Sequence, residues 1–242
     1  MSEPLVRLEN ISKRFGEKKV GWVGQQLERI GFKQSPSITA AVNQVNLSIQ
    51  KGEVVGLVGE SGCGKSTLGR IVAGMLPQSS GKVWVDGVDT TNMTKEEWRQ
   101  SQLKIQMIFQ DPFASLNPRL RVDDSIGEAA LTHGLVSRKE LDHYVSHQLE
   151  RAGLSASYRK RFPHQFSGGQ RQRIGIARAL AVQPEMLVCD EAVAALDVSI
   201  QAQIVNLFMD LRDELDLTYL FISHDLSVVE HFSDRVAIMY LG

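Results

Sequence analysis

One glycine-rich segment constrains the fold of this chain more than any other feature. Residues 59–66 read Gly-Glu-Ser-Gly-Cys-Gly-Lys-Ser and match the P-loop pattern G-x-x-x-x-G-K-[ST]. The mostly apolar residues 53–58 before the loop are typical of a buried strand, and residues 66–75 after it are typical of a helix. The sequence therefore predicts a strand, a phosphate-binding loop and a helix in direct succession.

The chemistry of phosphate binding explains the spacing of this loop. Glycines let backbone N–H groups approach phosphates closely, and the start of the following helix adds unpaired N–H donors and a partial positive charge. We expect Lys65 to reach the β- and γ-phosphates, the Ser66 hydroxyl to bind Mg²⁺ and Thr67 to contact the α-phosphate. A glycine-rich turn without a ligand is the alternative, but the pattern arises by chance in only about one chain in a hundred of this length. Residues 59–67 are thus predicted to bind ATP with Mg²⁺.

Three further short apolar runs predict an α/β domain. They occupy residues 105–109, 186–189 and 219–222. Helical patterns over residues 169–182 and 203–215 alternate with them. Strands that are apolar throughout have both faces buried, as in a parallel sheet covered by helices, and their alternation with helices favours an α/β fold.

Other parts of the chain depart from this alternation. Residues 6–8 and 45–49 alternate apolar and polar side chains, which is typical of half-buried strands. Between them, residues 16–39 are rich in Gly, Gln, Lys and Ser and are expected to form a long loop or insertion. Residues 125–162 have polar side chains at helical spacing and no strand run, so we expect a helical subdomain inserted into the α/β core. Prolines and an asparagine predict an ordered loop, not a helix, for residues 111–121.

Composition argues against several classes of protein. Of 242 residues, 43% are hydrophobic and 23% are charged, with a formal net charge of −1, which is ordinary for a globular protein. The chain has no basic excess, so no nucleic-acid partner is expected. No apolar run reaches the roughly 18 residues that span a bilayer, and the first residues do not resemble a signal peptide; we therefore expect a cytosolic chain that meets a membrane only through a partner. Cys63 and Cys189 lie far apart within other motifs, which argues against a disulfide framework or metal cluster.

Two acidic residues follow the apolar run 186–189. Asp190 ends this strand, at the position where P-loop enzymes hold Mg²⁺ through water. Glu191 comes next, and a second carboxylate beside a bound nucleotide can orient or deprotonate the attacking water. Neighbouring side chains on a strand point to opposite faces, but both can turn toward the nucleotide where the strand ends. A helix cap or turn role for Asp190 is the alternative, and the nearby P-loop weakens it.

With residues 166–173, Phe-Ser-Gly-Gly-Gln-Arg-Gln-Arg, the chain resembles the ATP-binding-cassette ATPases, whose signature motif this segment matches. The resemblance covers essentially the whole chain and implies one domain over residues 1–242. Its fold would be a P-loop NTPase core, a mostly parallel sheet flanked by helices, with an N-terminal antiparallel β-subdomain. The β-subdomain and core would occupy about residues 1–110 and 175–242, and an inserted α-helical subdomain about residues 111–174.

The same resemblance implies roles for further residues. The signature loop would face the γ-phosphate bound by an opposite subunit, so that a hydrolysis site needs two chains. Gln110 would be a ligand of Mg²⁺ and water, and His224 would contact the γ-phosphate. Residues 195–197 would cross the interface between the two subunits. Phe15 is a candidate for stacking on adenine, and Trp22 and Phe32 are competing candidates.

The candidate site residues fall into three groups. The catalytic candidates are Lys65, Glu191 and His224. The candidates for nucleotide binding are Phe15, Gly59, Glu60, Ser61, Gly62, Cys63, Gly64, Lys65, Ser66, Thr67, Gln110, Ser167, Gly168, Gly169 and Gln170. The candidate Mg²⁺ ligands are Ser66, Gln110 and Asp190.

Within the family, four stretches look most like the ATPase subunits of bacterial dipeptide, oligopeptide and nickel importers. They are residues 59–67, 107–118, 197–203 and 233–242. The resemblance implies an ATPase that powers import of peptides or a related small solute. It implies as partners a second ATPase subunit, identical or related, two integral membrane permeases and, indirectly, an extracytoplasmic solute-binding protein. The chain would lie at the cytoplasmic face of the inner (plasma) membrane as a peripheral subunit.

Departures from the family pattern leave alternatives open. Ala192 stands where the family usually has proline, Ala194 where it often has serine, and Phe166 where it usually has leucine. We expect these changes to alter rate or interface fit without abolishing activity, and we expect a C-terminal extension to be missing. A non-transport ATPase and a low-turnover nucleotide switch are alternative functions. The presence of both Glu191 and His224 argues against the switch.

Overall fold

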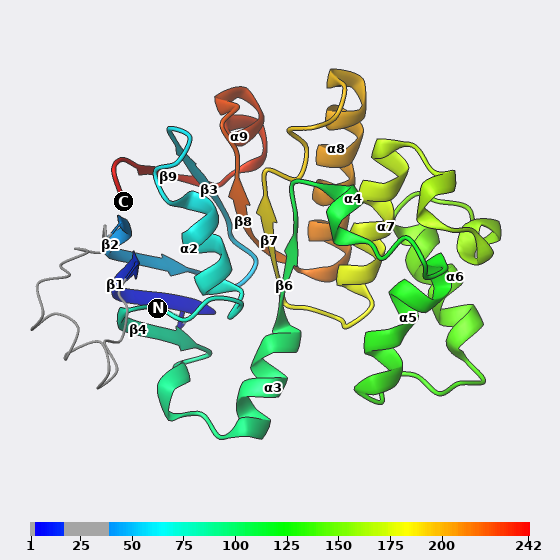
Figure 1. Cartoon of the computed structure of the whole chain (residues 1–242), viewed down its shortest axis with the longest axis horizontal. Helices are drawn as coiled ribbons and strands as arrows, with labels where there is room; N and C mark the ends of the chain where they lie inside the picture. The colour runs from blue at the N-terminus through cyan, green and yellow to red at the C-terminus, as the bar shows by residue number, and fades with distance from the viewer. Residues whose placement is uncertain (1–2, 17–38) are drawn as a thin grey trace, which may run out of the picture.

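The computed structural model of the chain describes residues 3–16 and 39–242. The loop expected over residues 16–39 lies almost wholly outside the described residues, as do Trp22 and Phe32. The described residues form two sheets and the helices around them (Figure 1). Among these helices, none is long and apolar enough to cross a membrane.

The first sheet is antiparallel, with strand order β2-β1-β4-β5. Its strands are β1 (Val6–Phe15), β2 (Thr39–Ile49), β4 (Ser80–Val85) and β5 (Val88–Asp89). Residues 6–8 and 45–49, predicted as strands from their alternation, lie inside β1 and β2. Val6 and Leu8 are buried on one face because alternate side chains of a strand point the same way.

The second sheet is parallel, with strand order β6-β7-β8-β3-β9. Its strands are β3 (Val54–Gly59), β6 (Ile105–Ile108), β7 (Met186–Asp190), β8 (Thr218–Ile222) and β9 (Arg235–Met239). Every residue of β7 and β8 is buried, which explains their continuous apolar runs. The edge strand β9 is largely exposed, and it was not among the predicted strands although residues 236–239 are all apolar. The predicted α/β class is confirmed.

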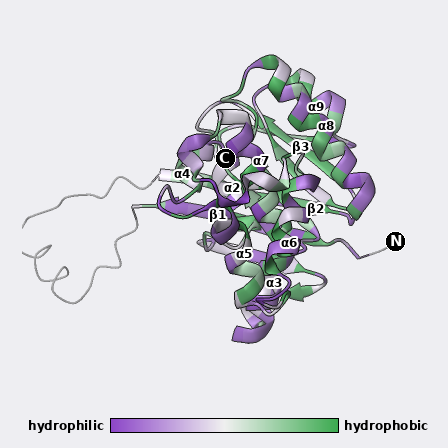
Figure 2. Cartoon of the chain, turned by 90° about the vertical axis from the view of Figure 1, so that its right-hand side faces the viewer, coloured by the Kyte–Doolittle hydropathy of each residue, from purple (hydrophilic) through white to green (hydrophobic). Residues whose placement is uncertain are grey.

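The parallel sheet separates two hydrophobic cores. The helices beside it are α2 (Lys65–Val72), α3 (Lys95–Lys104), α7 (Gly168–Leu180), α8 (Val198–Leu215) and α9 (Leu226–Phe232). Val188 and Leu220 belong to the core that contains α2 and the antiparallel sheet, whereas Leu187 and Tyr219 belong to the core that contains α7, α8 and α9. Hydrophilic and hydrophobic residues alternate along α8 and α9 (Figure 2). Each of these helices buries one side against the core. Helices α2 and α7 therefore lie on opposite faces of the sheet.

Two helix boundaries differ from the sequence prediction by three residues or more. The helix predicted over residues 66–75 ends at Val72, because the chain reverses at Gly74, whose φ of 68° is favourable only for glycine and a few other residues. The helix predicted over residues 203–215 begins earlier, at Val198. Its first turn has no regular apolar pattern because Val198 is exposed.

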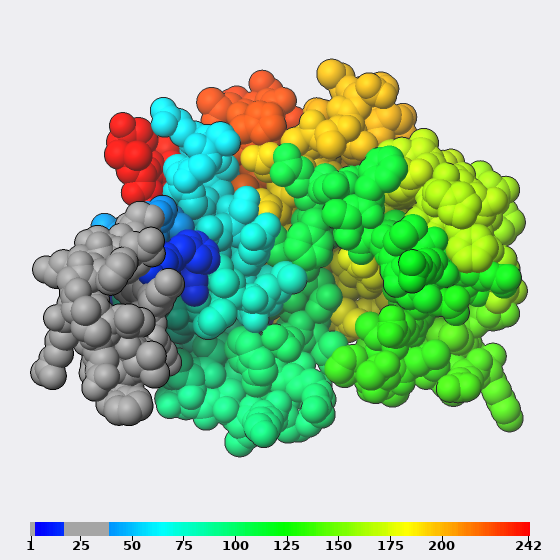
Figure 3. Space-filling view, viewed as in Figure 1, coloured from blue at the N-terminus to red at the C-terminus, as the bar shows by residue number. Residues whose placement is uncertain are grey.

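Between β6 and β7 the chain forms a helical part. It contains α4 (Pro112–Ser115), α5 (Val122–Thr132) and α6 (Leu141–Arg151) and leads into α7. This part lies at the end of the molecule opposite the antiparallel sheet (Figures 1 and 3). The loop predicted over residues 111–121 is wrong for residues 112–115, which form a helical turn. Pro112 is tolerated because the first helical position needs no N–H donor, and the Asp111 carboxylate accepts a hydrogen bond from the N–H of Phe113 at 2.7 Å.

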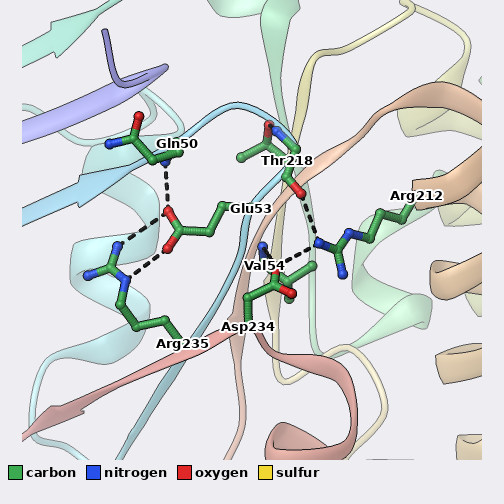
Figure 4. A network of polar contacts seen from close by, with 8 residues as sticks. Gln50, Glu53, Val54, Arg212, Thr218, Asp234 and Arg235 are labelled. Carbon is green, nitrogen blue, oxygen red and sulfur yellow. Dashed lines mark hydrogen bonds and ion pairs between the residues drawn. The ribbon is translucent and has the colours of Figure 1, made fainter. Parts of the chain in front are cut away.

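A network of charged side chains fastens the amino-terminal edge of the parallel sheet (Figure 4). Arg235, at the start of β9, donates to both carboxylate oxygens of Glu53, at 2.8 and 3.3 Å. Asp234 accepts hydrogen bonds from the backbone N–H of Val54 at 2.8 Å and from Arg212 at 2.6 Å. The network joins β9, β3 and α8 at the edge of the sheet remote from the P-loop.

We predict that Asp234→Ala lowers the free energy of unfolding by about 1–3 kcal/mol, because it removes the acceptor of the buried Val54 N–H and the ion-pair partner of Arg212. Urea unfolding followed by circular dichroism measures this difference. Asp213→Ala, at an exposed position of α8, is the matched control and should stay near wild type. Equal stability of the two variants would contradict the role of the network.

Candidate functional site

The loop between β3 and α2 brings its backbone close to neighbouring strands. Gly64, with a φ of 106°, is the N-cap of α2 and supplies no side-chain hydrogen bond. The first N–H groups of α2 therefore have no side-chain cap, and the positive end of the helix dipole faces the loop. A Cβ on Gly64 would lie 2.0 Å from the carbonyl oxygen of Ala41, and one on Gly59 would lie 2.1 Å from that of Met239. Residues larger than glycine are therefore excluded at both positions. The uncapped N–H groups at the start of α2 are donors suited to an anion.

Lys65 is held against the backbone of this loop. The side chain is buried, and its Nζ donates to the carbonyls of Gly59 at 2.7 Å and Glu60 at 2.8 Å. The thiol of Cys63 lies 3.9 Å away. Within the described residues, the Lys65 ammonium forms no ion pair with a carboxylate. A buried cation with neutral acceptors favours the binding of an anionic group beside it.

Ser66 and Asp190 bring two oxygen ligands together. The Ser66 hydroxyl donates to Oδ1 of Asp190 at 2.7 Å, which links the start of α2 to the end of β7. Burial raises the pKa of the Asp190 carboxyl, although the bond from Ser66 opposes this shift. A hydroxyl at the start of α2 and a carboxylate at the end of β7 match the all-oxygen preference of Mg²⁺. These residues therefore fit the expected magnesium ion.

Three polar side chains from three strand ends meet beside this pair. The amide Nε2 of Gln110, after β6, donates to Oε2 of Glu191 at 2.8 Å. Oε1 of Glu191 lies 3.7 Å from Nδ1 of His224, which follows β8. Glu191 has a φ of 48°, a left-handed conformation that ends β7 abruptly. Because of this turn, the carboxylates of Asp190 and Glu191 both lie at the carboxyl-terminal edge of the parallel sheet.

The signature residues, 167–170, lie at the start of α7, away from the P-loop. Ser167 is the N-cap of α7, and it forms a capping box in which it accepts from the Gln170 N–H at 3.4 Å and donates its own N–H to the Gln170 side chain at 3.1 Å. Gly168 lies against Leu196 and Gly169 against Ile200. Because α7 and α2 lie on opposite faces of the parallel sheet, the described structure does not bring residues 167–170 to the P-loop of the same chain.

Phe15 lies at the end of β1 with 43% of its surface exposed. The ammonium of Lys13 lies 5.4 Å from the centre of its ring. Phe15 pairs with Thr39 in β2, the strand whose Ala41 carbonyl contacts the P-loop. The structure thus places an accessible aromatic ring at the strand end nearest the loop.

Sequence patterns did not identify several residues that shape the site. Ala41 and Met239 contribute through their carbonyl groups, so their side chains carry no signal. The signature motif gives Arg171 no separate role. A signal did exist there, because an arginine in the first turn of a helix opposes the helix dipole and needs a specific partner.

Comparison with known proteins identifies close relatives in sequence. The family model described as ABC transporter matches residues 42–194. The oligopeptide transport ATP-binding protein AppF of Bacillus subtilis is 53% identical over 212 residues, which cover 87% of this chain and 64% of AppF. OppF of Salmonella typhimurium is 50% identical over 212 residues, with the same coverage of 87% and 64%. The chain thus spans less than two thirds of the length of these relatives.

Solved structures show the same fold. The dimeric post-hydrolysis structure of the ATP-binding cassette MJ0796, bound to ADP and Pi, has a TM-score of 0.81 and 29% identity, covering 98% of this chain and 95% of that one. CbiO1 of Clostridium perfringens, part of the ABC transporter complex cbiONQ, has a TM-score of 0.80 and 25% identity, covering 100% and 86%. Sequence and fold agree, and the chain belongs to the ABC transporter family.

Proposed function

We propose that this chain binds Mg-ATP on the P-loop and hydrolyses it, and that hydrolysis powers import of peptides or a related small solute. The observation that carries the proposal is the meeting of Gln110, Glu191 and His224 beside the Ser66–Asp190 pair. This arrangement supplies a carboxylate for the attacking water next to oxygen ligands for a metal ion. A phosphate-binding loop alone would support binding but not hydrolysis.

The roles of the residues follow from their positions. The loop N–H groups and Lys65 hold the phosphates, and phosphate oxygens replace the carbonyls that Lys65 contacts in the described structure. Ser66 and Gln110 would hold Mg²⁺, with Asp190 acting through water, and the bound ion would neutralise charge on the β- and γ-phosphates. Glu191 orients the attacking water and accepts its proton.

Two further contacts prepare Glu191 and the phosphate for this reaction. Gln110 fixes one oxygen of the Glu191 carboxylate through its amide N–H, which leaves the amide oxygen of Gln110 for the metal ion. His224, whose side chain is 62% exposed, lies near the other carboxylate oxygen and is accessible to the γ-phosphate.

A second subunit would complete each site. Residues 167–170 form the N-terminal cap and first turn of α7 and lie across the sheet from the P-loop, so they are available to a nucleotide held by another chain. The dimeric structures of the similar cassette MJ0796 support this arrangement. The partner would be a second copy or a related ATPase subunit.

Two observations support a role in transport: the names of the similar proteins AppF and OppF, and a groove beside the helical part. AppF and OppF are named as oligopeptide transport ATP-binding proteins. A groove of about 490 Å³ lies between the sheet core and the helical part, with Met107, Phe109 and Ala129 among its lining residues. It lies beside the segment that follows Gln110, where a permease would sense the nucleotide. We propose a peripheral subunit at the cytoplasmic face of the inner (plasma) membrane, acting with two permeases and indirectly with a solute-binding protein.

We predict that Glu191→Gln retains ATP binding but lowers kcat by roughly 10²–10⁴-fold, because the amide cannot accept the proton of the attacking water. Phosphate release and binding of a fluorescent ATP analogue measure the two quantities separately. Glu214→Gln, at an exposed glutamate of α8, should behave as wild type. Near-normal turnover of Glu191→Gln would contradict the catalytic role of Glu191. Very slow turnover of the wild type would favour a nucleotide switch.

We also predict that Ser66→Ala raises the Mg²⁺ concentration for half-maximal hydrolysis by about tenfold, since it removes one oxygen ligand. Titration of the ATPase rate with MgCl₂ at fixed ATP gives this value. Ser66→Thr keeps the hydroxyl and should remain close to wild type. Identical Mg²⁺ dependence of the alanine and threonine variants would contradict the metal-ligand role.

A further inference from the structure

The short helix α4, which begins two residues after Gln110, contacts α7 through two side chains. The guanidinium carbon of Arg171 lies 3.7 Å from the centre of the Phe113 ring. Arg178 donates a hydrogen bond to the carbonyl of Ser115. The two arginines are seven positions apart, which places them about two turns apart on the same side of α7. One side of α7 thus holds the segment that carries Gln110.

The same Arg171 guanidinium also holds the turn that precedes the signature loop. Its Nε donates to the carbonyl of Pro163 at 2.7 Å, and a terminal nitrogen donates to the carbonyl of His164 at 3.5 Å. Arg171 is buried, whereas Phe113 is 63% exposed. The exposed ring therefore covers a buried cation, an arrangement in which cation–π attraction strengthens as water is excluded.

These contacts form a continuous connection between two functional segments. Glu191 accepts a hydrogen bond from Gln110. Asp111 follows Gln110 in the sequence, and its carboxylate caps α4 by accepting a hydrogen bond from the N–H of Phe113. Phe113 stacks on Arg171, which lies in the first turn of α7, and Ser167 caps that same turn. A ligand that moves Gln110 would move Phe113 with it, because only two residues separate them.

We propose that Arg171, stacked on Phe113, is a positioning residue that relays occupancy of this chain's own nucleotide site to residues 167–170, the loop offered to the partner subunit. The proposal rests on the proposed function, since it assumes that the partner's site uses this loop. It assigns the pair a role in coupling the two sites of a dimer, beyond the stability that Arg171 gives to the turn. The coupling is a positional effect, so it should appear in the rate of turnover and not in ATP affinity.

Phe113→Leu tests this role without disturbing the turn. The substitution removes the ring face but leaves the hydrogen bonds from Arg171 to Pro163 and His164 intact. Because Phe113 is exposed, its replacement does not open a core cavity. Phe113→Tyr keeps the ring and is the rescue variant. Phe162→Leu is the matched control, because it removes a ring that lies 5.7 Å from another arginine, Arg121, and 5.7 Å from the ring of His164, neither of which belongs to α4 or α7.

We expect Phe113→Leu to lower kcat about fivefold while the ATP dissociation constant, measured in the Glu191→Gln background, stays unchanged. Phe113→Tyr and Phe162→Leu should match the wild type. In dilute monomeric Glu191→Gln chain, ATP should change the amide hydrogen exchange of residues 163–171, and adding Phe113→Leu should abolish this change. Arg171→Lys, which keeps the charge but not the planar stack, should behave as Phe113→Leu does.

Two results would overturn the relay. One is a kcat of Phe113→Leu equal to that of wild type, and the other is an ATP-induced exchange change that persists without the ring. Failure of the proposed function has a different signature, because the wild type would then not hydrolyse ATP and Glu191→Gln would change nothing. The exchange measurement still tests the relay in that case, since it needs ATP binding only.

Discussion

The parallel alignment of β3, β6, β7 and β8 is the constraint on which the rest of this structure depends. Parallel strands end at the same edge of a sheet, so the residues that follow them are brought together regardless of their distance in sequence. The P-loop, Gln110, the acid pair and His224 each follow one of these strands. The hydrogen bonds from Ser66 to Asp190 and from Gln110 to Glu191 are the visible result. At the opposite edge, the Glu53–Arg235 and Arg212–Asp234 pairs hold the strand starts in register.

The sheet also divides the molecule chemically. Its two faces belong to different hydrophobic cores, with α2 on one side and α7 on the other. One chain therefore carries a phosphate loop and a signature loop that do not meet. In the proposed function this separation makes hydrolysis a property of a pair of chains, and the contact of Phe113 with Arg171 gives the two halves a mechanical link.

Fully buried strands and the P-loop could be predicted from sequence because their signals are local. β7 and β8 have no exposed position, so each is a continuous apolar run. The edge strand β9 also has an apolar run, at residues 236–239, but most of its residues are exposed, and it was not among the predicted strands. The turn at Pro112 was missed because prolines also mark loops, and only the structure shows Asp111 capping it. The pairing of Gln110 with Glu191 joins residues 81 positions apart and depends on strand order, which no local pattern contains. The assignments of the individual site residues remain predictions, to be decided by the substitutions above.

A subunit-mixing experiment tests the central claim, that each hydrolysis site takes its P-loop from one chain and its signature loop from another. Lys65→Ala disables the first half, and Ser167→Arg blocks the second. We predict that each variant alone is inactive and that their mixture regains hydrolysis, because a mixed pair contains one site with both halves intact. A mixture that stays inactive while mixed pairs form, or a Ser167→Arg chain with wild-type turnover, would contradict the account.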